Sequence, residues 1–221
     1  MPMTKTLVGT FLLLFAIPAI AFVAEKTEVS KTYEVVELDY APEVKQAYVG
    51  NLDNYPVMYE MSSDEPFKLT TQVWQRYRSG NEPAPLSLIA VSVNKDETGV
   101  TEVARLRPSK DDWVLYKDKK LGMTFWVAPK MEEEVEAGVY RVEVSTPNNQ
   151  GDFMVVFGDI EQNAGYFKTL SSIRIVQNNF GYGIFRMLLA SPVYYTLGII
   201  FLLLAFYKTW QYRKLISNGS N

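Results

Sequence analysis

The chain has 221 residues, no cysteine, no histidine and a formal net charge of −3 at neutral pH. These absences exclude disulfide bonds, a thiolate nucleophile, zinc or haem sites built on Cys and His, and every Ser-His-Asp arrangement. A metal site would need oxygen ligands, which favour calcium or magnesium. No motif in the sequence predicts a cofactor.

Residues 1–21 have the pattern of a secretory signal peptide. Lys5 supplies a positive start, residues 7–17 form an apolar core, and Ala19-Ile20-Ala21 after Pro18 resembles a cleavage site of small residues. An uncleaved membrane anchor is the alternative, because the 19 uncharged residues that precede Glu25 approach the ~20 needed to span a bilayer. Pro18 and the small residues after it favour cleavage after Ala21.

The next part of the chain, up to residue 159, has the pattern of an all-β domain. Residues 22–46 are rich in charge, and we expect an extended segment there with one short strand at 33–38. Residues 47–159 contain short β-branched and aromatic runs separated by Pro, Gly, Asn and Asp. This pattern predicts a jelly-roll or immunoglobulin-like sandwich. The expected strands in it are 47–52, 57–61, 67–77, 86–93, 100–106, 113–116, 124–127 and two runs within 137–159.

The clearest pattern is AGVYRVEVSTPNNQGDFMVVFGD, residues 137–159, in which two apolar runs flank a turn-forming segment. It predicts a β-hairpin. In the first strand Tyr140, Val142 and Val144 alternate with polar residues, so one face should be buried and the other wet. Residues 153–157 are apolar on both faces, which predicts a central strand covered on both sides.

These residues carry a resemblance to a known family. The segments YPVMYEM (55–61), DEP (64–66), GVYRVEV (138–144) and GDF (151–153) resemble the bacterial pre-peptidase C-terminal (PPC) type of β-sandwich, as in uncharacterised single-pass membrane proteins. Domains of that type usually act as attached folding or binding modules. The resemblance therefore implies interaction rather than catalysis, and it transfers no functional residue.

Two groups within the predicted sandwich could in principle form a site, and only the second is a candidate. Glu132-Glu133-Glu134 lacks calcium-loop spacing and is interpreted as a solvated loop. Trp74, Arg76 and Arg78 alternate out of phase with the apolar residues of their strand, so they are a candidate contact face for carbohydrate or protein. The alternative is that another strand or the N-terminal segment covers that face.

Residues 160–186 predict a short amphipathic helix followed by a glycine-containing hinge. Phe167, Leu170, Ile173 and Val176 recur at helical spacing, with polar residues, Gln177 among them, elsewhere on the wheel. Two interpretations remain open at this stage. The helix lies at a bilayer surface as a juxtamembrane element, or its apolar stripe packs back onto the domain.

Residues 187–207 form an uncharged run of transmembrane length, which predicts one C-terminal transmembrane helix. Basic residues follow it and no acid occurs after Glu161, so the tail at 208–221 should be cytoplasmic and the sandwich should lie outside. The predicted membrane-interface residues are Tyr194, Tyr195, Tyr207, Lys208, Trp210, Tyr212, Arg213 and Lys214.

The sequence as a whole therefore predicts a single-pass protein of the cell membrane with a non-catalytic binding or accessory module outside. Residues 22–186 carry all 25 acids and 22 − 4 = 18 bases, a net charge of −7, which argues against binding nucleic acid or anionic lipid. The expected partners are the bilayer, a protein of the membrane or envelope, and carbohydrate. The alternatives are a carboxylate-dependent, glycosidase-like hydrolase and, as a minor one, a p24-type cargo receptor.

Overall fold

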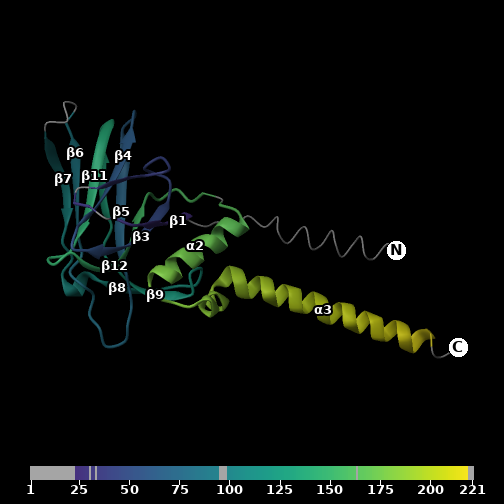
Figure 1. Cartoon of the computed structure of the whole chain (residues 1–221). Coiled ribbons are helices and arrows are strands. Elements are labelled where there is room, and N and C mark those ends of the chain that lie inside the picture. The colour runs from purple at the N-terminus through teal and green to yellow at the C-terminus, as the bar shows by residue number, and fades with distance from the viewer. Residues whose placement is uncertain (1–22, 30, 33, 95–98, 163, 219–221) are drawn as a thin grey trace.

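The computed structural model describes residues 23–29, 31–32, 34–94, 99–162 and 164–218. Two β-sheets face each other, and helices follow them towards the C-terminus (Figure 1). The all-β prediction is confirmed at this level, as two sheets with an apolar C-terminal helix. The predicted signal peptide lies outside the described residues.

The larger sheet has seven strands in the order β1-β3-β12-β5-β9-β8, with β10 paired to the first half of β5. β1 runs parallel to β3, and the remaining pairs in this sheet are antiparallel. Its central strand β12 has a partner on each edge. The bounds are β1 (Val23–Thr27), β3 (Gln46–Asp53), β5 (Phe67–Arg76), β8 (Val114–Asp118), β9 (Met123–Val127), β10 (Met131–Val135) and β12 (Gln150–Phe157).

The smaller sheet has five strands in the order β2-β4-β11-β6-β7. β2 runs parallel to β4, and the other pairs are antiparallel. The strand bounds are β2 (Val35–Glu37), β4 (Val57–Ser63), β6 (Ser87–Val93), β7 (Val100–Leu106) and β11 (Gly138–Ser145).

The main core lies between the two sheets. Tyr140, Val142 and Val144 of β11 point into it and are buried, as their alternation predicted. Near one end of the core Tyr59 and Phe157 meet edge to face at 5.3 Å, and the Tyr59 hydroxyl donates to Thr27 Oγ1 at 3.0 Å. Complete burial of a large side chain contributes about 1.5–3 kcal/mol, so such a core can hold a domain together without disulfides.

A second apolar layer covers the outer face of the larger sheet. β12 contributes to both layers, since Phe153, Val155 and Phe157 point to the main core while Met154 and Val156 point outward. The outward side chains belong to the same cluster as residues of helix α2 (Tyr166–Asn179). The prediction that residues 153–157 form a central strand covered on both sides is confirmed.

Helix α2 packs back onto the domain, which was one of the two interpretations of residues 160–186. Ile173 and Val176 are buried, and Ser172 Oγ accepts a hydrogen bond from the Ala24 amide at 3.0 Å. The buried face is rotated from the predicted one. Phe167 is 75% exposed, whereas Gln177 is buried and donates from Nε2 to the Leu121 carbonyl at 2.8 Å. A backbone acceptor in the turn after β8 therefore satisfies the amide nitrogen of this polar residue at the sheet.

The chain then passes through a short 3₁₀ helix, η2 (Ile184–Leu189), into helix α3 (Ser191–Asn218), which extends away from the sandwich (Figure 1). Residues 191–214 of α3 are long and apolar enough to cross a membrane, and none of their most apolar stretch is buried against the domain. The helix begins four residues later than the apolar run from position 187 suggested, because the first part of that run forms η2.

The predicted hairpin at residues 137–159 is wrong. β11 pairs with β4 and β6, whereas β12 pairs with β3 and β5 in the other sheet. The short connection between them, with Asn149 at φ 48°, crosses from one sheet to the other. Packed sheets lie only about 10 Å apart, so a connection of hairpin length can also join facing strands. The alternation of side chains is the same in both cases.

Two further strands lie in segments that were expected to be irregular. The 22–46 segment contains β1 in addition to β2, and Glu132–Glu134, expected as a solvated loop, lies within β10. In β10 the buried ends Met131 and Val135 anchor the strand on β5 while the glutamates between them stay exposed. Charged side chains are common on edge strands, where they discourage pairing with other chains. The single strand predicted at 33–38 corresponds to β2, which is shorter and spans Val35–Glu37.

A carboxyl pair at β1 makes stability depend on pH. A hydrogen bond that the protonated Glu25 carboxyl donates to Asp39 raises the pKa of Glu25 above its usual 4.5, with burial as the second cause. A carboxyl whose pKa is higher in the folded state stabilises the fold below its unfolded pKa, and this contribution is lost as pH rises through the folded pKa. We therefore expect the free energy of unfolding of the full chain to fall as pH rises above about 4.5.

Glu25→Gln should remove that loss, because the amide can donate to Asp39 at every pH. The measurement is denaturant unfolding in detergent, followed by tryptophan fluorescence at several pH values. Glu28→Gln is the control, since a hydrogen bond from Lys26 lowers the pKa of Glu28, the opposite direction. Equal pH profiles for wild type and Glu25→Gln would contradict the assignment.

Candidate functional site

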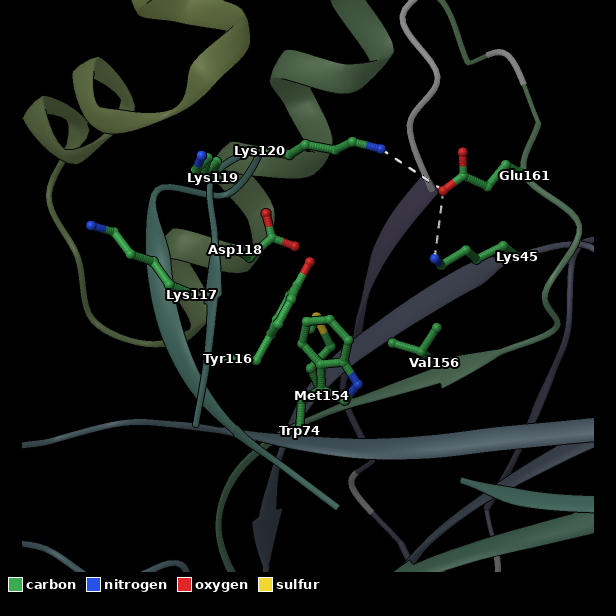
Figure 2. Close-up of a pocket in the computed structure, with 10 residues that line it drawn as sticks. All are labelled: Lys45, Trp74, Tyr116, Lys117, Asp118, Lys119, Lys120, Met154, Val156 and Glu161. Atoms are coloured by element: carbon green, nitrogen blue, oxygen red, sulfur yellow. Dashed lines mark ion pairs between the residues drawn. The ribbon is translucent and has the colours of Figure 1, made fainter. Parts of the chain in front are cut away.

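A hollow of about 350 Å³ lies on the outer face of the larger sheet. Its floor comes from β5 and β12, one wall comes from β8 and the turn after it, and the other comes from residues beside β3 and β12 (Figure 2). The lining residues are Lys45, Trp74, Tyr116, Lys117, Asp118, Lys119, Lys120, Met154, Val156 and Glu161.

The floor of the hollow is aromatic and firmly held. The Trp74 ring meets Tyr116 and Phe125 edge to face, each with ring centroids 5.4 Å apart. Its indole N–H donates to Gln72 Oε1 at 3.0 Å, and Gln72 Nε2 donates in turn to the Ala128 carbonyl at 2.7 Å. Tyr116 remains 48% exposed. The rings therefore offer a preorganised apolar surface that a ligand can reach.

The rim is basic, with four lysines and two carboxylates among the lining residues. Glu161 Oε1 lies 3.7 Å from Lys45 Nζ and 3.9 Å from Lys120 Nζ, so one carboxylate is shared by two cations (Figure 2). Asp118 is buried, and its Oδ1 accepts the Leu121 amide at 2.8 Å. Both carboxylates have structural partners, and the lining as a whole carries a net charge of 4 − 2 = +2. An anion is the ligand that this balance favours.

Of the three predicted contact residues, only Trp74 lines the hollow. Arg76 lies under the segment after α2, where its Nη1 donates to the Phe180 carbonyl and its guanidinium stands 4.0 Å from the centre of the Tyr182 ring. Arg78 is exposed beyond the end of β5. The three residues therefore do not form one open face. Among the described residues, the cover over Arg76 comes from Phe180 and Tyr182, which follow α2.

The predicted membrane-interface residues all belong to α3. Tyr194 and Tyr195 lie in its first turns, with ring centroids 4.5 Å apart, and the others lie in its second half. Lys214 Nζ stands 3.9 Å from the centre of the Trp210 ring. Among the residues that the structure describes, no three carboxylates come together as a metal site.

The basic wall of the hollow is joined to the start of α3. The Ser191 amide donates to the Lys119 carbonyl at 2.8 Å, and Arg186 Nε donates to the Gly122 carbonyl at 3.1 Å. Sequence reasoning missed this turn. The basic run at 117–120 in an otherwise acidic domain was a usable signal for a charged site, but nothing in the sequence indicated that the run lies beside α3.

No protein-family model and no curated protein match the chain. One similar solved structure is the pre-peptidase C-terminal domain of a collagenase from Bacillus anthracis, at 11% identity and a TM-score of 0.36. The match covers 59% of this chain and 98% of that chain. It is a domain of the type that the sequence resembles. A TM-score of this size reflects a loose likeness and gives no residue of this chain a role.

Gly122 lies in the turn where it packs against the backbone between η2 and α3. Its φ is +64°, and a Cβ there would lie 2.8 Å from the Leu189 carbonyl carbon and 2.9 Å from the Ala190 nitrogen. We expect Gly122→Ala to push the turn away from the start of α3. The added methyl group would collide with backbone atoms, which cannot rotate aside as a flexible side chain could. Limited proteolysis of the full chain in detergent should show faster cleavage between residues 180 and 191.

Gly80→Ala is the matched control. Gly80 has a similar φ of +82°, but a methyl group added there would meet nothing within 4 Å, so the variant carries the backbone strain without the collision. The strain alone costs about 1–2 kcal/mol. We call the contact between the β8–β9 turn and the backbone at residues 186–191 the joint. Equal cleavage rates in the two variants would show that the close packing at Gly122 does not hold this joint.

Proposed function

We propose that the chain is a single-pass membrane protein whose β-sandwich is a non-catalytic binding or accessory module outside the cytoplasm. The observation that carries this proposal is the exposure of α3. The helix has an apolar stretch of 24 residues, and the most apolar part of that stretch is not buried in the domain. Side chains such as Phe201 and Phe206 are more than 70% exposed. Left in water, that surface would cost about 25 cal/mol for each Å², whereas a bilayer would cover it.

The charges around α3 support the orientation. Lys208, Arg213 and Lys214 lie in its second half, and the positive-inside rule puts that end in the cytoplasm. Tyr194 and Tyr195 then lie at the opposite interface, where amphipathic rings are enriched. The predicted signal peptide agrees with export of the sandwich, with cleavage after Ala21 or retention as an anchor as its two outcomes.

The candidate site supports binding rather than hydrolysis. An inverting or retaining glycosidase needs two carboxyl groups free to act as acid and as base or nucleophile. In the hollow Glu161 is held by two lysines and Asp118 caps a turn. An aromatic floor below a basic rim instead suits an anionic group presented by a protein partner in the membrane or envelope.

Topology can be tested with single cysteines because the chain has none. Ser79→Cys, exposed in the sandwich, should react with a membrane-impermeant maleimide in intact cells. Ser220→Cys in the tail should react only after permeabilisation. The chain should also resist extraction by alkaline carbonate. The reverse labelling pattern, or release by carbonate, would contradict the proposal.

Partner binding can be tested by photo-crosslinking in native membranes. A photoreactive residue in place of Tyr116 should give a discrete adduct, and Lys45→Glu with Lys120→Glu should reduce it because the rim would no longer attract an anion. A probe at Val100 is the control, since that residue is 56% exposed on the other sheet. The same adducts from both positions, or none from Tyr116, would exclude the hollow as the binding site.

A further inference from the structure

The turn between β8 and β9 and the start of α3 form one rigid unit. Hydrogen bonds join Ser191 to Lys119, Arg186 to Gly122 and Gln177 to Leu121. The absence of space at Gly122 leaves little room for movement between the two backbones. If α3 spans a bilayer, as proposed above, this turn is held beside the first residue of the span, and therefore at the level of the lipid headgroups.

The turn is basic in a domain that is otherwise acidic. Lys117, Lys119 and Lys120 fall within four consecutive positions, and the only acid among them, Asp118, is buried and bonded to the Leu121 amide. Among the described residues, Lys117 and Lys119 make no ion pair, and Lys120 has one long pair to Glu161 at 3.9 Å. Although residues 22–186 have a net charge of −7, the β8–β9 turn therefore presents a local cationic surface.

An apolar surface lies next to these lysines. Ile184, Phe185, Leu188 and Leu189 of η2 are each at least 50% exposed, and Phe185 is 83% exposed. Arg186, the one charged residue of η2, bonds to the Gly122 carbonyl and stacks 4.7 Å from the centre of the Tyr182 ring. Between η2, α2 and α3 there is also an almost wholly apolar hollow of about 370 Å³. A short helix with this distribution matches the boundary between headgroups and acyl chains.

We infer that the β8–β9 turn and η2 together form a docking surface for anionic phospholipid in the leaflet that faces the sandwich. The lysine ammonium groups contact lipid phosphates, and the apolar side chains of η2 enter the outer part of the acyl region. This inference deepens the proposed function and depends on it. This docking surface would orient the domain so that α2 faces the bilayer. The acidic parts of the sandwich would then point away from the bilayer.

The test uses the full chain in nanodiscs made with neutral phosphatidylcholine, with or without phosphatidylglycerol. Phe185→Cys carries an environment-sensitive fluorophore, and spin-labelled lipids report its depth by quenching. With anionic lipid the label should be quenched by spin labels at shallow acyl positions. Lys119→Gln with Lys120→Gln should shift the docked-to-undocked ratio by about five-fold for each lysine, and high salt should do the same.

Arg107→Gln with Lys110→Gln is the matched control, because it removes the same charge from exposed residues before β8, at the end away from the turn. Equal quenching in the two double variants would overturn the inference, and so would a label unquenched in both lipid mixtures. Loss of the chain from membranes on carbonate washing would instead overturn the proposed function, and this inference with it. A retained chain with an unquenched label leaves the proposed function standing.

Discussion

The arrangement of this protein depends on one contact, between the turn after β8 and the backbone where η2 passes into α3. Gly122 lies against Leu189 and Ala190 with no space for a methyl group, and hydrogen bonds to Lys119 and Gly122 close the joint on both sides. Without that contact, the packing of Ala190 and Val193 on the outer apolar layer would be left to fix the direction of the apolar helix. With it, the direction of α3 is fixed relative to the larger sheet.

The joint is possible because the larger sheet is covered on both faces. β12 supplies side chains to the core between the sheets and to the layer under α2, so the helix has an apolar surface on which to pack. Gln177 then reaches the Leu121 carbonyl from that helix. The same outer face that receives α2 also carries the aromatic floor around Trp74. Helix packing, the hollow and the joint therefore share one surface of one sheet.

The distribution of charge matters more here than its sum. A domain with a net charge of −7 over residues 22–186 would be repelled by an anionic bilayer if the charge were spread evenly. Salt screening limits such repulsion to about 10 Å. A strand of eight residues is longer than this, about 26 Å, so acids at the far end of the sandwich are screened from the bilayer. Lysines at the base of the domain can therefore contact phosphates while the acids elsewhere remain in water. Local placement, fixed by the joint, makes an acidic protein compatible with a membrane surface.

The sequence by itself determined the class of fold, the buried face of β11, the two-sided burial of β12 and the presence of an apolar helix near the C-terminus. Each of these follows from side-chain spacing along a single element, since strands repeat every two residues and helices every 3.6. Only the tertiary structure decided that β11 and β12 belong to different sheets, that the glutamates of β10 lie in a strand, and that Gln177 rather than Phe167 faces the domain. It also decided that Lys117–Lys120 lie beside Ser191, some 70 positions away along the chain. Those outcomes depend on which surfaces meet, and the period of one element carries no information about its partner.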